Sequence, residues 1–153
     1  MRLTTFTDYS LRVLVFLAAD SPRRATIGEI ARAFDISENH LMKVVHLLGK
    51  GGVLANVRGK GGGLELAKAP SAINVGKVVR MTEGHPVPAE CFDRERNACV
   101  ITPICRLRGV LGEAVKAFYE VLDRYTLADL VRNRHALAKV LFADAHRPPS
   151  VHQ

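Results

Sequence analysis

Residues 26–52 read TIGEIARAFDISENHLMKVVHLLGKGG. Thr26 followed three residues later by Glu29 is a capping-box signature, and the apolar residues after it recur at helical spacing. Ser37 is a typical N-cap for a second helix, whose expected inward face is Leu41, Val44, Val45 and Leu48. Two helices joined by a tight turn at residues 35–36, the second with a polar N-terminal end, form the helix-turn-helix pattern.

A glycine-rich stretch follows these two helices. Residues 53–57 and 64–67 have the composition of short strands, and residues 58–63 between them read RGKGGG. Glycines at a hairpin tip let the backbone come close to a phosphate surface, as a DNA-binding wing requires. The stretch lacks the Gly-Lys-Ser/Thr ending of a nucleotide-binding phosphate loop. We therefore expect a wing over about residues 53–67.

The rest of the chain indicates a mainly α fold with a small β-hairpin wing: a winged helix-turn-helix domain plus a long dimerisation helix. A first helix is expected from an N-cap at Thr7, and another over residues 74–83. A longer helix from about Pro103 has an apolar face too wide for one small domain to cover, which favours a contact between two copies. The expected segments are a DNA-binding domain (1–83), a cysteine loop (84–105), a dimerisation helix with a docking helix (106–131) and a disordered tail (143–153).

Charge and composition point to a nucleic-acid partner. The 153 residues include 22 Lys and Arg against 15 Asp and Glu, a net charge of +7, which favours a polyanion such as double-stranded DNA. From the helix-turn-helix pattern we expect the major groove to be contacted by Ser37, Asn39, His40 and Lys43. At the wing we expect DNA contacts from Arg58, Gly59 and Lys60. No apolar run approaches the roughly 20 residues of a membrane span, and no signal-peptide cleavage site follows the start, so we expect a cytoplasmic protein. No redox Cys-x-x-Cys pair, catalytic triad or nucleotide-binding loop indicates an enzyme.

The three cysteines of the chain are Cys91, Cys99 and Cys105, separated by seven and five residues. In a reducing cytoplasm, such clustering argues for a metal or redox site rather than a structural disulfide, although buried inert thiols fit the same residues. Structural zinc sites favour pairs two to four residues apart, and no such pair exists here. An iron-sulfur cluster tolerates wider spacing, and it normally takes four protein donors, so one ligand comes from outside the three cysteines.

Residues 1–12 (MRLTTFTDYSLR), the RGKGGG stretch and the three cysteines together resemble the Rrf2 family of transcriptional regulators. The resemblance runs from Met1 to about Val131 and is strongest to the nitric-oxide-sensing repressors of that family. It implies a homodimer, a winged-helix domain, a long dimerisation helix and an iron-sulfur cluster, 4Fe-4S or 2Fe-2S, that controls operator binding.

The identity of the fourth cluster ligand does not follow from the cysteines alone. Some members of the family use a His three residues after the last cysteine, and this chain has Arg108 there. The resemblance suggests Asp8, reaching across from the partner subunit. An ion pair between Asp8 and Arg12 at i,i+4 explains the same two residues, and Arg12 is also our candidate for coupling the cluster to DNA. Other candidates for the fourth ligand are His85, Glu90 and Asp93.

The hypothesis from the sequence is a DNA-binding repressor whose cluster senses nitric oxide, so that loss or nitrosylation of the cluster releases the operator. Two alternatives stay open. An Rrf2-type regulator can sense iron-sulfur or redox status, and the cysteines can sense oxidation directly as thiols without any cluster.

Overall fold

The computed structural model describes residues 2–85 and 87–143. Its helices are α1 (Thr5–Ala19), α2 (Ile27–Phe34), α3 (Glu38–Lys50), α4 (Val75–Glu83), α5 (Arg106–Asp123), α6 (Leu127–Leu130) and α7 (Arg134–Leu141). The strands are β1 (Leu54–Val57) and β2 (Gly63–Leu66), and single 3-10 turns are η1 (Pro70–Ala72), η2 (Glu90–Phe92) and η3 (Thr102–Ile104). The expected class, mainly α with a β-hairpin, is confirmed. The predicted tail from Ala143 onward falls, apart from Ala143, outside the described residues.

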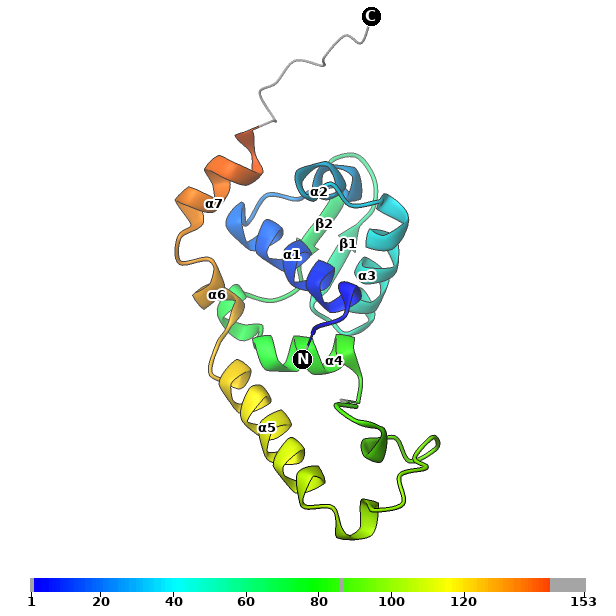
Figure 1. Cartoon of the computed structure of the whole chain (residues 1–153). Coiled ribbons are helices and arrows are strands. Elements are labelled where there is room, and N and C mark those ends of the chain that lie inside the picture. The colour runs from blue at the N-terminus through cyan, green and yellow to red at the C-terminus, as the bar shows by residue number, and fades with distance from the viewer. Residues whose placement is uncertain (1, 86, 144–153) are drawn as a thin grey trace, which may run out of the picture.

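Helix α1 runs through the middle of the globular body, between α2 and α3 on one side and α4 on another (Figure 1). Its apolar residues recur at helical spacing, and Val13, Leu14, Phe16 and Leu17 are buried. The predicted N-cap at Thr7 is wrong: the helix begins at Thr5, and the Thr4 hydroxyl accepts the Thr7 N–H at 3.2 Å. The Thr7 side chain is instead fully buried against α4.

The helix-turn-helix forms as the caps predict. Thr26 and Glu29 make a complete capping box at the start of α2, and the Ser37 hydroxyl accepts the His40 N–H at the start of α3. Between the helices, Asp35 adopts a left-handed conformation with φ of 53°, which turns the chain within two residues. Ile36 is buried directly after that turn and holds it on the core.

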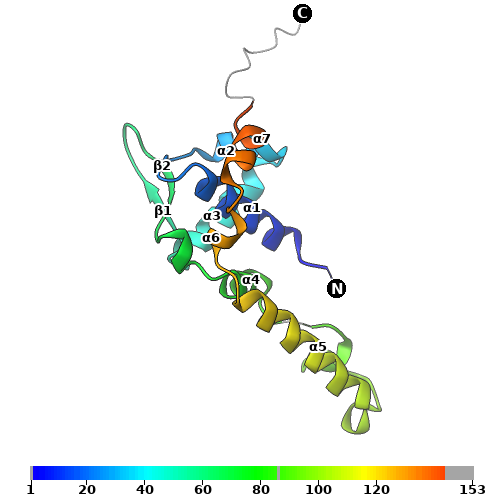
Figure 2. The same cartoon turned by 90° about the vertical axis from the view of Figure 1, so that its left-hand side faces the viewer.

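The hairpin is a two-stranded antiparallel sheet in which Leu54 pairs with Leu66 and Val57 pairs with Gly63. Leu64 also pairs with Ala25 in the linker before α2, with N–O distances of 3.0 and 2.7 Å in the two directions. The linker therefore fixes the base of the hairpin, while its tip stands out from the body (Figure 2).

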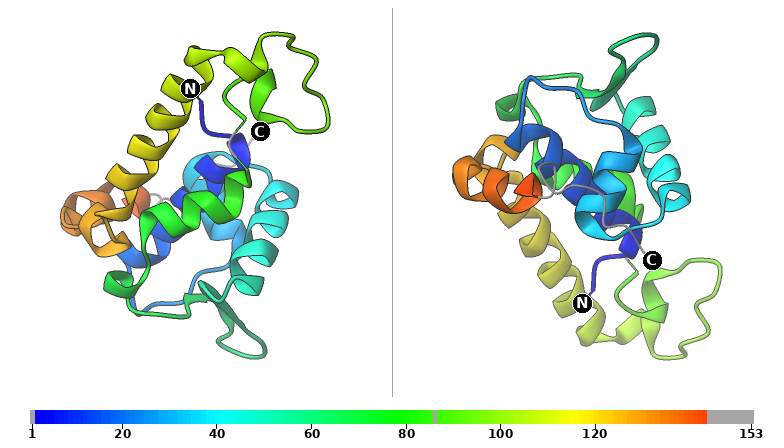
Figure 3. Two further views of the ribbon diagram at one scale, coloured as in Figure 1. Left: turned by 90° about the horizontal axis from the view of Figure 1, so that it is seen from below. Right: turned by 90° about the horizontal axis from the view of Figure 1, so that it is seen from above.

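Helix α5 extends away from the body, with the cysteine loop at its far end, opposite the hairpin (Figures 1 and 3). Its C-terminal part packs on α4 through a small second core of Val75, Val79 and Tyr119. Helices α6 and α7 then return along the body. Among the described residues, each helix is too short or too polar to span a lipid bilayer.

Helix α7 was not predicted from the sequence. Its apolar face packs back on α1, where the Phe142 ring lies 5.0 Å from the Phe16 ring in an edge-to-face arrangement. Asn133 precedes the helix without a side-chain cap bond, so the usual start signal is missing.

Candidate nucleic-acid interface and cysteine site

The N-terminal end of α3 presents a polar surface. Its predicted base-reading residues are all exposed: Ser37, Asn39, His40 and Lys43. The Ser37 oxygen accepts the His40 N–H at 3.3 Å, which leaves the hydroxyl proton free to donate outward. The structure thus brings these four residues together on the first two turns of one helix.

The tip of the hairpin presents a second basic surface, since Arg58, Gly59 and Lys60 are all exposed. The Gly62 N–H donates to the Gly59 carbonyl at 2.9 Å, which closes the tip into a tight turn. Gly59 has φ of 92°, a conformation that favours glycine. The wing residues therefore lie on a turn of defined shape.

Arg24 supports the wing and was missed by the sequence reasoning. Its Nε donates to Glu65 at 2.6 Å and its Nη1 donates to the Gly61 carbonyl at 3.2 Å. These bonds tie the linker before α2 to the hairpin tip. Arg24 and Glu65 lie 41 residues apart in the chain, so no local pattern could reveal the pair.

The cysteines lie in the loop between α4 and α5, on different local elements. Cys91 is in η2, Cys99 follows a turn, and Cys105 is the residue directly before α5. All three are partly exposed free thiols.

Hydrogen bonds connect the segments of the loop that carry the cysteines. The Glu90 carboxylate accepts the Ala98 N–H at 2.5 Å, and Cys91 and Cys99 are the next residues of the chain after these two. Arg108, in the first turn of α5, donates to the Cys91 carbonyl at 3.3 Å, and its guanidinium lies 5.7 Å from the Phe92 ring centroid. The loop is thus tied to the same end of α5 that carries Cys105.

The donor chemistry suits an iron-sulfur cluster, because three soft thiolates come from one loop. Positive charge lies close to them in the chain, from Arg94 and Arg96 in the loop and from Arg106 and Arg108 in the first turn of α5. Within the described residues of one chain, however, no three His, Cys, Asp or Glu side chains form a ready metal site. A cluster bound by these thiolates would therefore need a fourth donor and some movement of the loop.

The candidate fourth ligands have different surroundings. Asp8 pairs with Arg12 at 2.8 Å, and both side chains are nearly half exposed. Glu90 is occupied by the Ala98 N–H, and Asp93 accepts the N–H groups of Glu95 and Arg96. His85 lines a surface pocket of about 140 Å³ between the chain before α1, the loop after α4 and the middle of α5. Within one chain the structure does not bring Asp8 and the cysteines together as a metal site.

The entrance to the cysteine loop is bonded to the start of α1. Glu83, the last residue of α4, accepts the Thr4 N–H at 2.7 Å and the Thr4 hydroxyl at 2.9 Å. One turn on, the Thr7 hydroxyl donates to the Thr82 hydroxyl at 2.8 Å. Burial alone would raise the pKa of Glu83, but hydrogen bonds from Thr7 and Thr4 outweigh it and hold that pKa below its usual value.

The start of α1 in turn contacts α2 and α3. The Tyr9 ring lies 6.3 Å from the His40 ring of α3, and the Arg12 guanidinium lies 5.9 Å from Tyr9 and 5.8 Å from Phe34 of α2. A continuous set of contacts therefore runs from the cysteine loop through α1 to the predicted DNA-reading residues.

Known proteins resemble this chain over most of its length. The sequence profile of Rrf2, described as an iron-dependent transcriptional regulator, matches residues 3–133. The chain is 51% identical over 142 residues to the HTH-type transcriptional regulator NsrR of Bacillus subtilis, covering 92% of this chain and 97% of that protein. The NsrR of Geobacillus kaustophilus is also 51% identical, with the same coverage.

Solved structures show the same fold. IscR of T. potens superimposes with a TM-score of 0.70 at 27% identity, covering 87% of this chain and 88% of that one. The oxidised form of CymR from Staphylococcus aureus gives a TM-score of 0.68 at 24% identity, covering 86% of this chain and 97% of that one.

Proposed function

This chain belongs to the Rrf2 family of transcriptional regulators. On this basis we propose that it is a homodimeric repressor whose iron-sulfur cluster senses nitric oxide. The observation that carries the sensing part is the loop from Gly84 to Cys105, which holds every cysteine of the chain. That loop lies between the DNA-binding body and α5. A change in the loop therefore acts on both.

Operator DNA is read by α3 and the wing. Ser37, Asn39, His40 and Lys43 face base edges and phosphates of the major groove, because they are the exposed polar residues at the start of the second helix of the motif. Arg58, Gly59 and Lys60 contact the backbone or the minor groove beside it.

Dimerisation uses the outer face of α5. Its exposed apolar residues are spaced alternately by three and four positions, as in a coiled-coil seam: Leu107, Val110, Ala114, Ala117 and Val121. Leu107 and Val110 are about 60% exposed within one chain, at 61% and 59%. A second copy of the same helix would cover this stripe symmetrically.

Cys91, Cys99 and Cys105 would hold the cluster, with Asp8 of the partner subunit as the fourth donor. When bound, the cluster supplies iron that reacts with nitric oxide. The chain's own residues hold the loop in place: Glu90 fixes its middle through Ala98, and Arg108 fixes Cys91 to α5. These donors suit a 4Fe-4S and a 2Fe-2S cluster equally.

The signal would reach DNA through α1. Glu83 and Thr4 join the loop entrance to the start of α1, and Tyr9 joins α1 to His40. DNA half-sites lie about 34 Å apart, so a small change in dimer geometry removes the fit to both at once. A second candidate function is direct thiol sensing, which is favoured by the partial exposure of all three free cysteines.

The decisive experiment uses protein purified without oxygen. We expect a coloured protein with iron and sulfide, whose absorption bleaches and whose operator affinity falls as nitric oxide is added. Cys99→Ser should lose the colour, whereas Arg94→Ala, an exposed change in the same loop, should keep it. A colourless wild-type protein that a thiol oxidant still releases from DNA would favour direct thiol sensing. A coloured protein indifferent to nitric oxide would favour sensing of iron-sulfur or redox status.

A further inference from the structure

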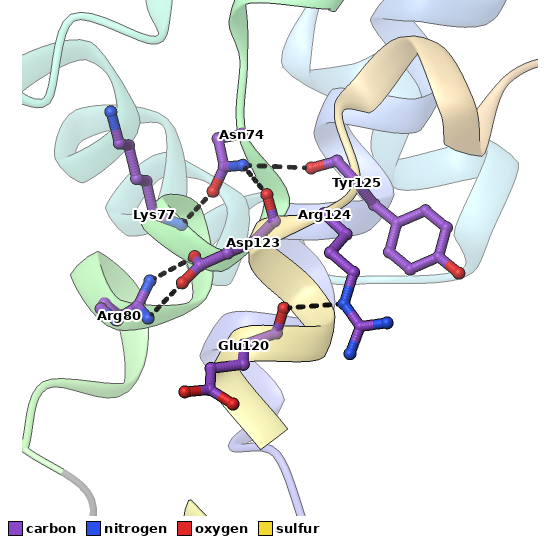
Figure 4. A network of polar contacts seen from close by, with 7 residues as sticks. All are labelled: Asn74, Lys77, Arg80, Glu120, Asp123, Arg124 and Tyr125. Carbon is purple, nitrogen blue, oxygen red and sulfur yellow. Dashed lines mark hydrogen bonds and ion pairs between the residues drawn. The ribbon is translucent and has the colours of Figure 1, made fainter. Parts of the chain in front are cut away.

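A bidentate ion pair joins α4 to α5 (Figure 4). We call the place where these two helices meet the joint. The two terminal nitrogens of Arg80 donate to the two carboxylate oxygens of Asp123, at 2.6 and 2.7 Å. The same guanidinium lies 4.5 Å from the ring centroid of Tyr119, one turn earlier on α5. Arg80 therefore contacts two successive turns of α5 with a planar group of fixed geometry.

A second set of bonds holds the C-terminal end of α5 against the start of α4. The Asn74 side-chain nitrogen donates to the Asp123 carbonyl at 2.7 Å, while its oxygen accepts the Lys77 N–H at 3.0 Å and caps α4. The backbone carbonyl of Tyr125, just after α5, accepts the Val75 N–H at 3.0 Å.

The helices meet at Gly76, where a side chain does not fit. A Cβ atom built there would lie 3.0 Å from the backbone nitrogen of Asp123 and closer still to its carboxylate. Only glycine allows α5 to lie at this distance from α4. The position and the tilt of α5 are thus both fixed at this joint.

Beyond the joint, the N-terminal part of α5 is a lever. Residues 106–110 are all exposed, and the helix rises about 1.5 Å per residue, so Leu107 lies roughly 24 Å from Asp123. A tilt of about 5° at the joint therefore moves the far end by roughly 2 Å. The seam proposed for the dimer lies along this lever.

We propose that Arg80 and Asp123 are positioning residues that set the angle between the DNA-binding body and the dimerisation helix, and thereby the half-site spacing that the dimer accepts. The inference rests on the proposed function, since it needs a dimer formed through α5. Neither residue touches DNA in this role; each acts by orienting the two recognition helices relative to one another.

The exposure of the pair agrees with an orienting role. The Arg80 and Asp123 side chains are 44% and 41% exposed, and ion pairs in such positions contribute little to folding stability. A bidentate guanidinium–carboxylate contact nevertheless fixes direction as well as distance. Hydrogen bonds from Arg80 hold the pKa of Asp123 below its usual value, so the pair is charged at neutral pH.

The test compares Arg80→Gln, Asp123→Asn and Arg80→Lys with the wild-type protein, all prepared without oxygen. Lys116→Gln is the matched control, because it removes an exposed ion pair with Glu120 that lies within α5 and does not reach α4. The DNA probes are the inverted-repeat duplex recovered from random DNA by the wild-type dimer, versions with one base pair added or removed between the half-sites, and a single half-site.

We expect Arg80→Gln and Asp123→Asn to remain dimeric and to bind the single half-site as the wild type does. Their preference for the original spacing over the altered ones should fall roughly fivefold, the size of a weak coupling between sites, with Arg80→Lys in between and the control unchanged. Wild-type spacing preference in both variants would overturn the proposal. Loss of folding or of the dimer would overturn it equally, because it would make the pair structural. Failure of the wild type to recover any inverted repeat would instead contradict the proposed function.

Discussion

The ring of Tyr9 in α1 lies 6.3 Å from the ring of His40 in α3, with 39° between the two planes. This distance falls in the range where aromatic rings attract one another. His40 is exposed at the N-terminal end of the recognition helix, and Tyr9 lies one residue after Asp8, the proposed ligand from the partner. The pair thus connects the first turns of α1, which carry the proposed cluster ligand, with the DNA-reading surface.

Replacing Tyr9 should weaken operator binding without removing the cluster. We expect Tyr9→Ala to lose roughly two- to tenfold in affinity, because an aromatic pair contributes about 0.5–1.5 kcal/mol. Tyr9→Phe keeps the ring and should bind as the wild type does. A double-mutant cycle with His40→Ala, measured by fluorescence anisotropy, tests the pairing directly, and strictly additive losses would show that the two rings do not act together.

Asp8 and Arg12 allow the ligand and ion-pair roles to be separated. Both Asp8→Ala and Arg12→Ala break the 2.8 Å pair, and because it is exposed each should cost less than about 1 kcal/mol of stability. Only Asp8→Ala should change the visible absorption spectrum and the iron retained per chain. Arg12→Ala should keep the spectrum and respond more weakly in DNA release on addition of nitric oxide. Identical spectra for the two variants and the wild type would exclude Asp8 as a ligand.

We expect α3 to read the bases and the wing to contact the DNA backbone, so variants in the two elements should have different effects. Asn39→Ala is expected to cost about 1–3 kcal/mol on the operator and to relax the choice of base at one position. Lys60→Ala should weaken binding to operator and random DNA alike and reduce the slope of log affinity against log salt by about one. Titrations at several salt concentrations measure both. Equal losses of specificity in the two variants would contradict this division.

The helix-turn-helix was predictable because its signals are local. Thr26 and Glu29 satisfy each other's backbone within three residues, and Ser37 caps α3 in the same way, so the sequence alone determines these starts. The clustering of three cysteines in one loop is likewise visible in their spacing. In these cases the residues that fix the structure are close neighbours in the chain.

Misses occurred where the partner of a residue is distant in the sequence. Threonine is a residue type that often caps helices, which is why Thr7 was predicted as the N-cap. In the structure the Thr7 hydroxyl instead donates to the Thr82 hydroxyl, 75 residues away, and Thr4 is the cap. Arg80 pairs with Asp123 across 43 residues, and no periodicity marks either one. Helix α7 forms largely because Phe142 and its neighbours pack on α1, which is a tertiary effect.

The contact between Glu83 and Thr4 should make the attachment of α1 to α4 dependent on pH. The folded-state pKa of Glu83 lies below its usual value, so its contribution to stability is fully present at neutral pH, above the unfolded pKa of about 4.3. That contribution is lost as the pH falls through the lower, folded pKa. The pKa values of Asp123 and Asp129 are also lowered, so their contributions to stability are lost on acidification as well. A variant is therefore needed to separate the contribution of Glu83 from theirs.

The variant Glu83→Gln isolates the contribution of the Glu83 carboxylate to the pH dependence of stability. The amide can still accept the Thr4 N–H, but it gives up the charge, so we expect about 1 kcal/mol less stability at pH 7. Because the variant has no proton to bind at this position, its stability should fall less steeply than that of the wild type below pH about 4.3, and the two curves should converge. Urea unfolding at a series of pH values from neutral to acid measures the difference. Parallel curves across the whole series would mean that the Glu83 carboxylate has the same proton affinity in the folded and unfolded chain, and that its bonds to Thr4 do not hold α1 to the entrance of the cysteine loop.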